Sequence, residues 1–181
     1  MFFLTNKLKW EDLTRFNFFY PPFKYNVGRC LYVEKKYDEY KTYLDSNGIN
    51  INDQIKRTYI LGIDSRIDSG FNSGFDVDIS VRHEIICRGI IDKKGIDSKG
   101  IKYTLAKNSF PYYCDDNIVH ILLWLEEMID YESIKNIILD KLFDGNLKLM
   151  EEKCVFFRNR EELISIDNVP HIHIFIKDWL D

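Results

Sequence analysis

The sequence predicts an α+β fold in which a helical N-terminal third packs on a mostly antiparallel sheet, with one long helix in the C-terminal half. Apolar residues recur at helical spacing up to about residue 61, and runs rich in β-branched residues follow from about residue 79. One amphipathic segment interrupts those runs. The 181 residues, 45% of them hydrophobic, suit a single domain over 1–181, with a helical part at about 1–61 and a sheet-containing part at about 79–181.

The N-terminal helices are expected from periodicity and from residues that end helices. Residues 12–16 can begin a helix that Pro21-Pro22 would end, because proline cannot continue a helix. Apolar and aromatic side chains fall on one helical face across residues 31–46, and Asn47-Gly48 then provides a stop signal. A further helix is expected at about 51–61.

The sheet-forming part follows a loop-like segment, residues 62–78, which is rich in Gly, Ser, Asp and Asn. The elements expected after it are, in order, strands at 79–91 and 101–106 around a turn at 92–100, a loop at 108–117, a strand at 118–124, a helix at 131–143, a short strand at 153–157, a helical turn at 159–165 and a last strand at 171–177. The helix at 131–143 is predicted by an apolar stripe, and Asp144-Gly145 ends it.

Composition narrows the class of protein. The net charge of -4 argues against broad nucleic-acid binding, which needs a basic surface. No apolar run approaches the ~20 residues of a membrane span, and four widely spaced cysteines without a CxxC pair fit a reducing compartment. We therefore expect a soluble, intracellular protein. Abundant Ile, Asn, Lys, Tyr and Asp are typical of an AT-rich genome, such as that of a protist or a large DNA virus. For a viral protein, the expected location is the host cytoplasm.

The HxH motif His171-x-His173 is the first candidate site. Side chains alternate along a strand, so both imidazoles project from one face, and His120 on another strand can join them. Three histidines can ligate a divalent metal and leave a position open for water. They can also act as a general acid and base on a phosphoester, or be structural groups held by hydrogen bonds. The spacing leaves these alternatives open.

The stretch "FFRNREELIS" contains a second candidate. Asn159 and Glu162 have the spacing of a capping box, which is a sufficient structural explanation for both. Arg158 lies at a strand end near a helix N-terminus, where a guanidinium can bind a phosphate or carboxylate with two hydrogen bonds. The alternative role for Arg158 is a surface ion pair.

The loop "NSFPYYCDDN" contains a third candidate. Pro111 restricts the backbone, and Tyr112 and Tyr113 offer flat surfaces with a polar end, which suit stacking against a base or a sugar. Packing of the loop on its own protein is the alternative for the same two rings.

Two stretches of the C-terminal half are similar to a known family pattern. "KNSFPYYCDDNIVHILLW" is similar to N-D-[FW]-P-Y, a short spacer and H-[LI]-x-[VC]-W, and "CVFFRNREELISIDNVPHIHIFIK" is similar to W-F-[RK]-N, then L-x-S-[VI], then H-[FI]-H-V. They resemble the domain-of-unknown-function 3605 family (DUF3605), which includes the N-acetylglucosamine-induced protein 1 group of fungi. The N-terminal third resembles it only loosely, through an early Trp, Gly28-Arg29 and Tyr-rich helices.

The resemblance implies a set of site positions and a metabolic context at most, without a reaction. The matching positions are Asn108, Pro111, Tyr112, His120, Trp124, Phe157, Asn159, Leu163, Ser165, His171 and His173. The chain departs from the pattern at Phe156, where the family often has Trp, and at Leu125-Glu126, where it often has a Lys after the Trp124 position. The missing Lys would weaken an anion pocket that relied on it.

The leading hypothesis is a small enzyme or sensor that binds a phosphorylated small molecule, such as a nucleotide or nucleotide sugar, and as an enzyme hydrolyses it by histidine acid/base chemistry. The expected site residues are His120, His171 and His173 as acid or base, Arg158 as the anion clamp, and Asn108, Tyr112, Trp124, Asn159 and Ser165 as ligand-orienting groups. A non-catalytic interaction or regulatory module with a protein partner is the first alternative. The second is a metalloenzyme in which the three histidines hold a divalent metal.

Overall fold

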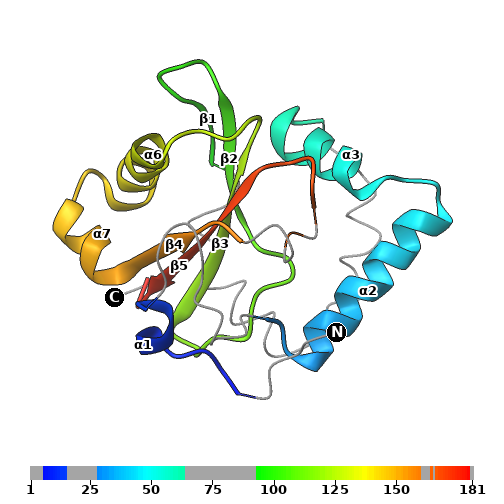
Figure 1. Cartoon of the computed structure of the whole chain (residues 1–181), viewed down its shortest axis with the longest axis horizontal. Coiled ribbons are helices and arrows are strands. Elements are labelled where there is room, and N and C mark those ends of the chain that lie inside the picture. The colour runs from blue at the N-terminus through cyan, green and yellow to red at the C-terminus, as the bar shows by residue number, and fades with distance from the viewer. Residues whose placement is uncertain (1–5, 16–27, 64–92, 160–163, 165, 180–181) are drawn as a thin grey trace.

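The computed structural model describes residues 6–15, 28–63, 93–159, 164 and 166–179, and all structural statements concern these ranges (Figure 1). The strands are β1 (Lys93–Ile96), β2 (Lys102–Lys107), β3 (Ile118–Leu125), β4 (Cys154–Phe157) and β5 (His171–Lys177). The helices are α1 (Trp10–Leu13), α2 (Leu31–Ser46), α3 (Ile51–Ile55), the π-helical turn η1 (Lys56–Ile60), α6 (Tyr131–Phe143) and α7 (Leu147–Lys153). The α+β class predicted from the sequence is confirmed.

The five strands form one sheet in the order β1-β2-β3-β5-β4, and every neighbouring pair is antiparallel. The last strand of the sequence, β5, therefore lies between β3 and β4. Its register against β3 places Trp124 opposite His171 and Leu122 opposite His173. Because side chains alternate, Trp124, Leu122 and His120 share one sheet face with both histidines of β5.

The two longest helices lie where the sequence predicts them. α2 covers Leu31–Ser46 and ends at Asn47-Gly48, and α6 covers Tyr131–Phe143. The N-cap of α6 is Asp130, whose side chain accepts a hydrogen bond of 2.9 Å from the Ser133 N–H. Asp144 ends α6 in the left-handed region with φ 49°.

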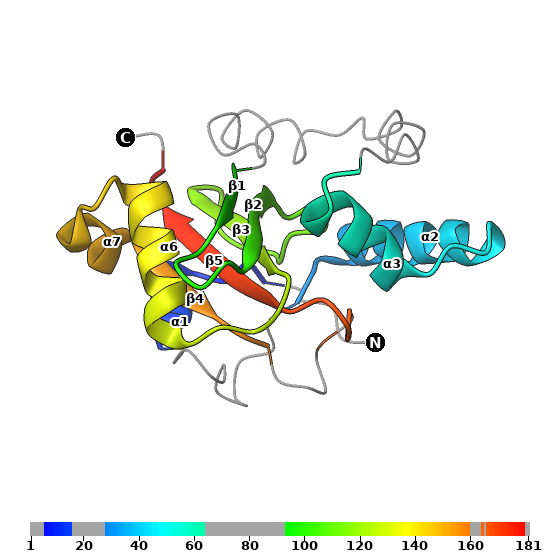
Figure 2. The same cartoon turned by 90° about the horizontal axis from the view of Figure 1, so that it is seen from above.

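Helices lie on opposite sides of the sheet, as Figures 1 and 2 show with α6 and α7 on one side and α2 and α3 on the other. On the first face, aliphatic side chains of β2, β3 and β5 pack against α6 and α7 in one large cluster. On the second face, α3 and η1 pack on Ala106, Leu122 and Trp124. A separate cluster there joins α1 to Phe157 and Phe175. Thus α1, α3 and η1 of the N-terminal part pack on the sheet, as predicted.

Some local predictions are wrong or lie outside the described residues. The segment 92–100, predicted as a turn, contributes β1, and the turn itself is shorter. The helix α7, which is only one to two turns long, was not predicted. The first helix begins at Trp10 and ends at Leu13, earlier than predicted. The strand expected at 79–91, most of the loop at 62–78 and most of the helical turn at 159–165 lie outside the described residues.

Candidate functional site

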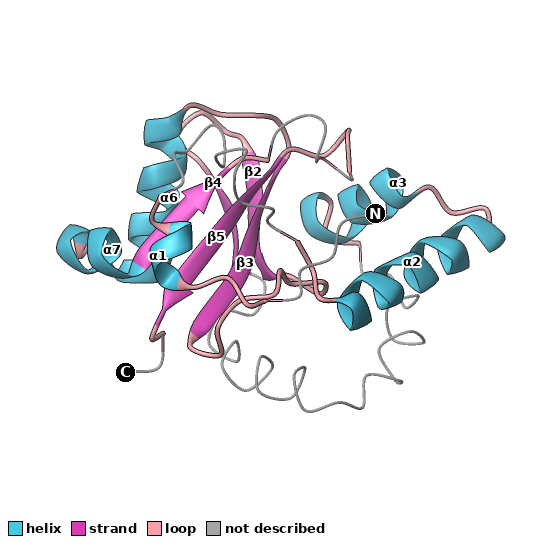
Figure 3. Cartoon of the chain, turned by 60° about the horizontal axis from the view of Figure 1, so that its bottom comes forward, coloured by secondary structure: helices cyan, strands magenta, loops and turns pink. Residues whose placement is uncertain are grey.

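The three candidate histidines lie together on the second face of the sheet, between its two apolar clusters. β3 supplies His120, and β5 supplies His171 and His173. The ring centroids of His120 and His173 are 5.1 Å apart, and those of His171 and His173 are 5.3 Å apart. Figure 3 shows β3 and β5 side by side at the centre of the sheet. The expectation that these histidines converge is met.

His120 and His173 form the centre of a hydrogen-bonded chain. The backbone N–H of Tyr112 donates to Nδ1 of His120 over 3.0 Å, and Nε2 of His120 lies 2.9 Å from Nδ1 of His173. At the other end, the side-chain amide of Asn159 lies 3.0 Å from Nε2 of His173 and 2.7 Å from the hydroxyl of Tyr112. His120 is 1% exposed and His173 is 4% exposed, so this chain is closed to solvent.

The loop that follows β2 is held against His120 from several directions. Oδ1 of Asn108 accepts a hydrogen bond of 2.9 Å from the N–H of Phe110, while its Nδ2 lies 3.3 Å and 3.4 Å from the two ring nitrogens of His120. The carbonyl of Phe110 accepts a bond of 3.0 Å from Nε of Arg29. The Tyr112 ring stacks on His173 at a centroid distance of 5.0 Å.

Arg29 and Glu34 belong to this site, and neither role was predicted from the sequence. Arg29 forms a partly buried ion pair of 3.1 Å with Glu34, and its guanidinium lies 4.1 Å from the centroid of the Tyr37 ring. Both residues come from the N-terminal third, whereas the loop that they hold comes more than 70 positions later. The one signal in the sequence is the Gly28-Arg29 pair in the family resemblance.

His171 has a different environment from the other two histidines. Its Nδ1–H donates to the carbonyl of Val169 over 3.0 Å, which leaves Nε2 as the acceptor nitrogen of the neutral ring. The centroid of the Trp124 ring lies 4.9 Å from that of the His171 ring, and Tyr59 of η1 stacks on Trp124 at a centroid distance of 5.2 Å. π-helical turns such as η1 are found frequently at functional sites.

Burial keeps two of the histidines neutral at pH 7. It lowers the pKa of His171, although the hydrogen bond to the Val169 carbonyl opposes this and the positive charge of Arg158 adds to it. Burial also lowers the pKa of His173 well below its usual value, with further contributions from His120, His171 and Arg29. The pKa of Tyr112 is raised, mainly by burial, so its hydroxyl stays protonated.

Two buried polar atoms beside the histidines have no hydrogen-bond partner among the residues that the structure describes. They are Nε1 of Trp124 and the side-chain atom of Asn159 assigned as Oδ1. Trp124 contacts the ring of His171, and Asn159 contacts His173, so the two unpartnered atoms flank the β5 histidines. Arg158 is half-buried, and among the described residues its side chain forms no ion pair.

The other expectations for the site have mixed outcomes. Ser165 lies outside the described residues. In the described part of the chain, no three His, Cys, Asp or Glu side chains are grouped so as to hold a metal ion. Cys114 and Cys154 are free thiols whose pKa values burial raises, to about 12 for Cys114. Neither thiol has the character of a nucleophile.

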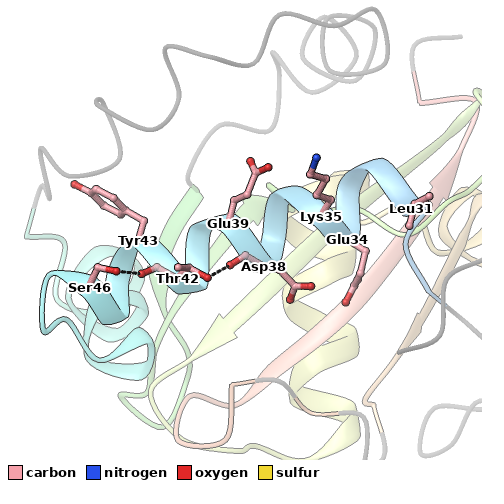
Figure 4. A pocket seen from close by; sticks show the side chains of 8 residues that line it. All are labelled: Leu31, Glu34, Lys35, Asp38, Glu39, Thr42, Tyr43 and Ser46. Atoms are coloured by element: carbon pink, nitrogen blue, oxygen red, sulfur yellow. Dashed lines mark hydrogen bonds between the residues drawn. The ribbon is translucent and has the colours of Figure 1, made fainter.

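An open groove lies away from the histidines, along α2. Its volume is about 720 Å³, and the side chains that line it come from one side of that helix, as Figure 4 shows. They are Leu31, Glu34, Lys35, Asp38, Glu39, Thr42, Tyr43 and Ser46. Glu34 links the groove to the site through its ion pair with Arg29, but none of the three candidate histidines lines it.

No helix within the described ranges combines the length and the apolar character needed to cross a membrane.

Comparison with known proteins gives matches over most of the chain. The family model described as "Protein of unknown function (DUF3605)" matches residues 2–177. The N-acetylglucosamine-induced protein 1 of Candida albicans is 23% identical over 158 residues, which is 79% of this chain and 58% of that protein. The chain thus spans less than two thirds of that relative. The crystal structure of HTC1 has the same fold, with a TM-score of 0.52 at 19% identity over 83% of this chain and 76% of that chain.

Proposed function

The chain belongs to the DUF3605 family, and we propose that it binds a phosphorylated small molecule, such as a nucleotide or nucleotide sugar, at the histidine face of its sheet. The observation that carries the proposal is the pair of unpartnered buried polar atoms on this face, Trp124 Nε1 next to His171 and the Asn159 amide atom next to His173. An unsatisfied buried polar group costs about 1–3 kcal/mol, so a bound group that satisfied both atoms would gain substantial affinity.

Arg158 supports an anionic ligand over a neutral one. Its positive charge acts on His171, and no carboxylate among the described residues forms an ion pair with it. A guanidinium and an indole N–H both donate hydrogen bonds, and phosphate oxygens accept them. The neutral His171 beside them fits a general acid or base for hydrolysis of the bound phosphoester.

The relative from Candida albicans gives a reason to choose particular compounds. Its name says that it is induced by N-acetylglucosamine, so amino-sugar phosphates and their nucleotide sugars belong among the ligands to be tried. The free thiols Cys30, Cys114 and Cys154 fit the further proposal of an intracellular location, where thiols stay reduced.

The test is thermal stability of the protein with nucleotides, nucleotide sugars, sugar phosphates and divalent metals. A ligand that binds only the native state raises the melting temperature by mass action. For a stabilising compound, we expect Trp124→Phe to weaken binding by about 10-fold, since it removes one hydrogen bond and keeps an aromatic ring. Trp10→Phe, which changes a tryptophan of α1, should leave the affinity unchanged. Absence of stabilisation by every compound would reject the proposal.

A non-catalytic interaction or regulatory module is the second candidate, and a specific observation favours it. His120 and His173 are buried and hydrogen-bonded to each other, as structural histidines are. In that case the histidines stabilise the sheet face to which a protein partner binds. The same measurements distinguish the two functions: a module would show no stabilisation by small molecules, and His171→Phe would alter stability alone.

A further inference from the structure

The direction of the hydrogen bonds on the histidine face follows from one donor that cannot reverse. The backbone N–H of Tyr112 can only donate, so Nδ1 of His120, 3.0 Å away, must be an acceptor without a proton. A neutral imidazole carries one proton, and that of His120 therefore lies on Nε2. Nε2–H then donates to Nδ1 of His173 over 2.9 Å.

The positions of the protons on His173 and Asn159 follow from that of His120. Because Nδ1 of His173 accepts, the proton of its neutral ring lies on Nε2, which faces the amide of Asn159 at 3.0 Å. Asn159 must accept this hydrogen bond with its side-chain carbonyl oxygen. Its side-chain amide is therefore rotated by about 180° from the orientation that places Nδ2 at this position. The oxygen then also accepts from the Tyr112 hydroxyl at 2.7 Å.

The opposite direction fails at His120. If Nδ2 of Asn159 donated to Nε2 of His173, His173 would donate from Nδ1, and the proton of His120 would have to lie on Nδ1. That proton would point at the backbone N–H of Tyr112, so two donors would face each other without an acceptor. Only the direction from Tyr112 to Asn159 gives each hydrogen bond along this row of side chains one donor and one acceptor.

This direction changes what the site offers to a ligand. The unpartnered atom of Asn159 becomes an NH₂ group, a donor, and the unpartnered atom of Trp124 is also a donor. His120 and His173 have both ring nitrogens engaged within the protein. His171 has Nδ1 engaged with the Val169 carbonyl, and its Nε2 remains as an acceptor at the edge of the site.

We infer that His171, through Nε2, is the catalytic histidine, that Asn159 and Trp124 donate hydrogen bonds to an oxyanion of the ligand, and that His120 and His173 are positioning residues. The inference rests on the proposed function and deepens it, because it names an oxyanion as the recognised group. In hydrolysis of the bound phosphoester, the Nε2 lone pair of His171 accepts a proton from a water whose oxygen forms a bond to phosphorus. The bond from phosphorus to the leaving oxygen breaks, and that oxygen takes the proton from His171.

The experiment is nitrogen NMR of the histidine rings in the ¹⁵N-labelled full chain, with and without inorganic phosphate as the probe. Single His→Gln substitutions assign each ring. We expect the Nε2–H form for His120 and His173 and the Nδ1–H form for His171. Added phosphate should shift Nε2 of His171 and the indole N–H of Trp124 in a saturable manner, whereas His120 and His173 keep their forms and the indole signals of Trp10 and Trp179 stay in place.

A second variant keeps the test independent of folding defects. His171→Phe preserves a ring against Trp124 and removes the nitrogen, and it should weaken phosphate binding at least 10-fold while the forms of His120 and His173 stay unchanged. An Nδ1–H form for His173 would overturn the inference, as would saturable phosphate binding that shifts Trp124 and leaves His171 unaffected. A lack of any phosphate effect on these signals would overturn both the inference and the proposed function.

Discussion

The histidines of the site differ in the use that each makes of its ring nitrogens. His120 and His173 share a hydrogen bond at the centre of a buried chain, and His171 binds a backbone carbonyl at the edge of that chain. The hydrogen bonds from Tyr112 through His120 and His173 to Asn159, and the bond from His171 to Val169, fit neutral imidazoles. A proton added to His173 would have to displace an existing donor, in a position where burial already disfavours charge.

The neutral state of His171 and His173 predicts how stability depends on pH. Their pKa values in the native state lie below the usual 6.5, so the unfolded chain binds protons at pH values where the native chain does not. The free energy of unfolding should therefore fall as the pH drops from 7.5 to 5.5, with a slope of up to about 1.4 kcal/mol per pH unit for each of the two histidines. Urea unfolding followed across this range measures the slope.

Substitution of a single histidine provides the control for this slope. His171→Gln and His173→Gln each remove one group that takes up a proton on unfolding, so each variant should have a shallower slope than the wild type. A wild-type stability that stayed constant over this range, or rose with acidity, would contradict the buried neutral state.

At the scale of single elements, β1 shows how one glycine permits a strand. Gly95 pairs with Tyr103 of β2, and a Cβ at this position would collide with the ring and hydroxyl of that tyrosine. Tyr103 is 5% exposed and belongs to the cluster that packs on α6. The glycine therefore allows the Tyr103 ring to cross over β1.

We expect Gly95→Ala to destabilise the protein by about 1–3 kcal/mol, which is the usual range for overpacking. Equilibrium unfolding in urea measures the change. In a Tyr103→Leu background the ring is absent, so the same Gly95→Ala substitution should have a much smaller effect. An equal loss in both backgrounds would show that the Tyr103 ring is not the cause.

The elements also show what the sequence could and could not predict. α2, α6 and β5 were predicted with their observed bounds, because each has a strong period and clear end signals. β1 was missed because Lys93, Lys94 and Gly95 carry no strand signal, and its pairing with β2 decides its conformation. The same-face position of His171 and His173 follows from alternation, but their contact with His120 depends on the register of β3 against β5. The roles of Arg29 and Glu34 depend on packing between distant segments, which periodicity does not report.

At the scale of the whole molecule, the sheet has apolar clusters on both faces. The first face packs one large aliphatic cluster under α6 and α7, and the second carries two smaller clusters with the histidines between them. β3 and β5 contribute residues to both faces, so neither face can lose its packing without disturbing strands that the other needs. This sharing favours one cooperative unit across the described residues.

We therefore expect the chain to unfold in a single transition, with the same urea midpoint by far-ultraviolet circular dichroism and by tryptophan fluorescence. Ile138→Val on the α6 face should lower both midpoints together, for a loss of about 0.5–1.5 kcal/mol. Phe157→Leu, on the opposite face, should also move both signals together. Two separate transitions, or a substitution that moved only one signal, would contradict the single domain.

The histidine pair also fixes how β5 aligns with its neighbours. His171–Ile176 are buried on both faces of this strand, so hydrophobicity alone would accept either face toward α6. A slip of one residue would place His171 and His173 among the aliphatic side chains of Ile134 and Ile138, which neither accept nor donate hydrogen bonds. It would also turn Ile172 and Ile174 toward the polar groups of Asn159 and Tyr112. The two imidazoles that form the site therefore also determine which face of β5 packs against α6.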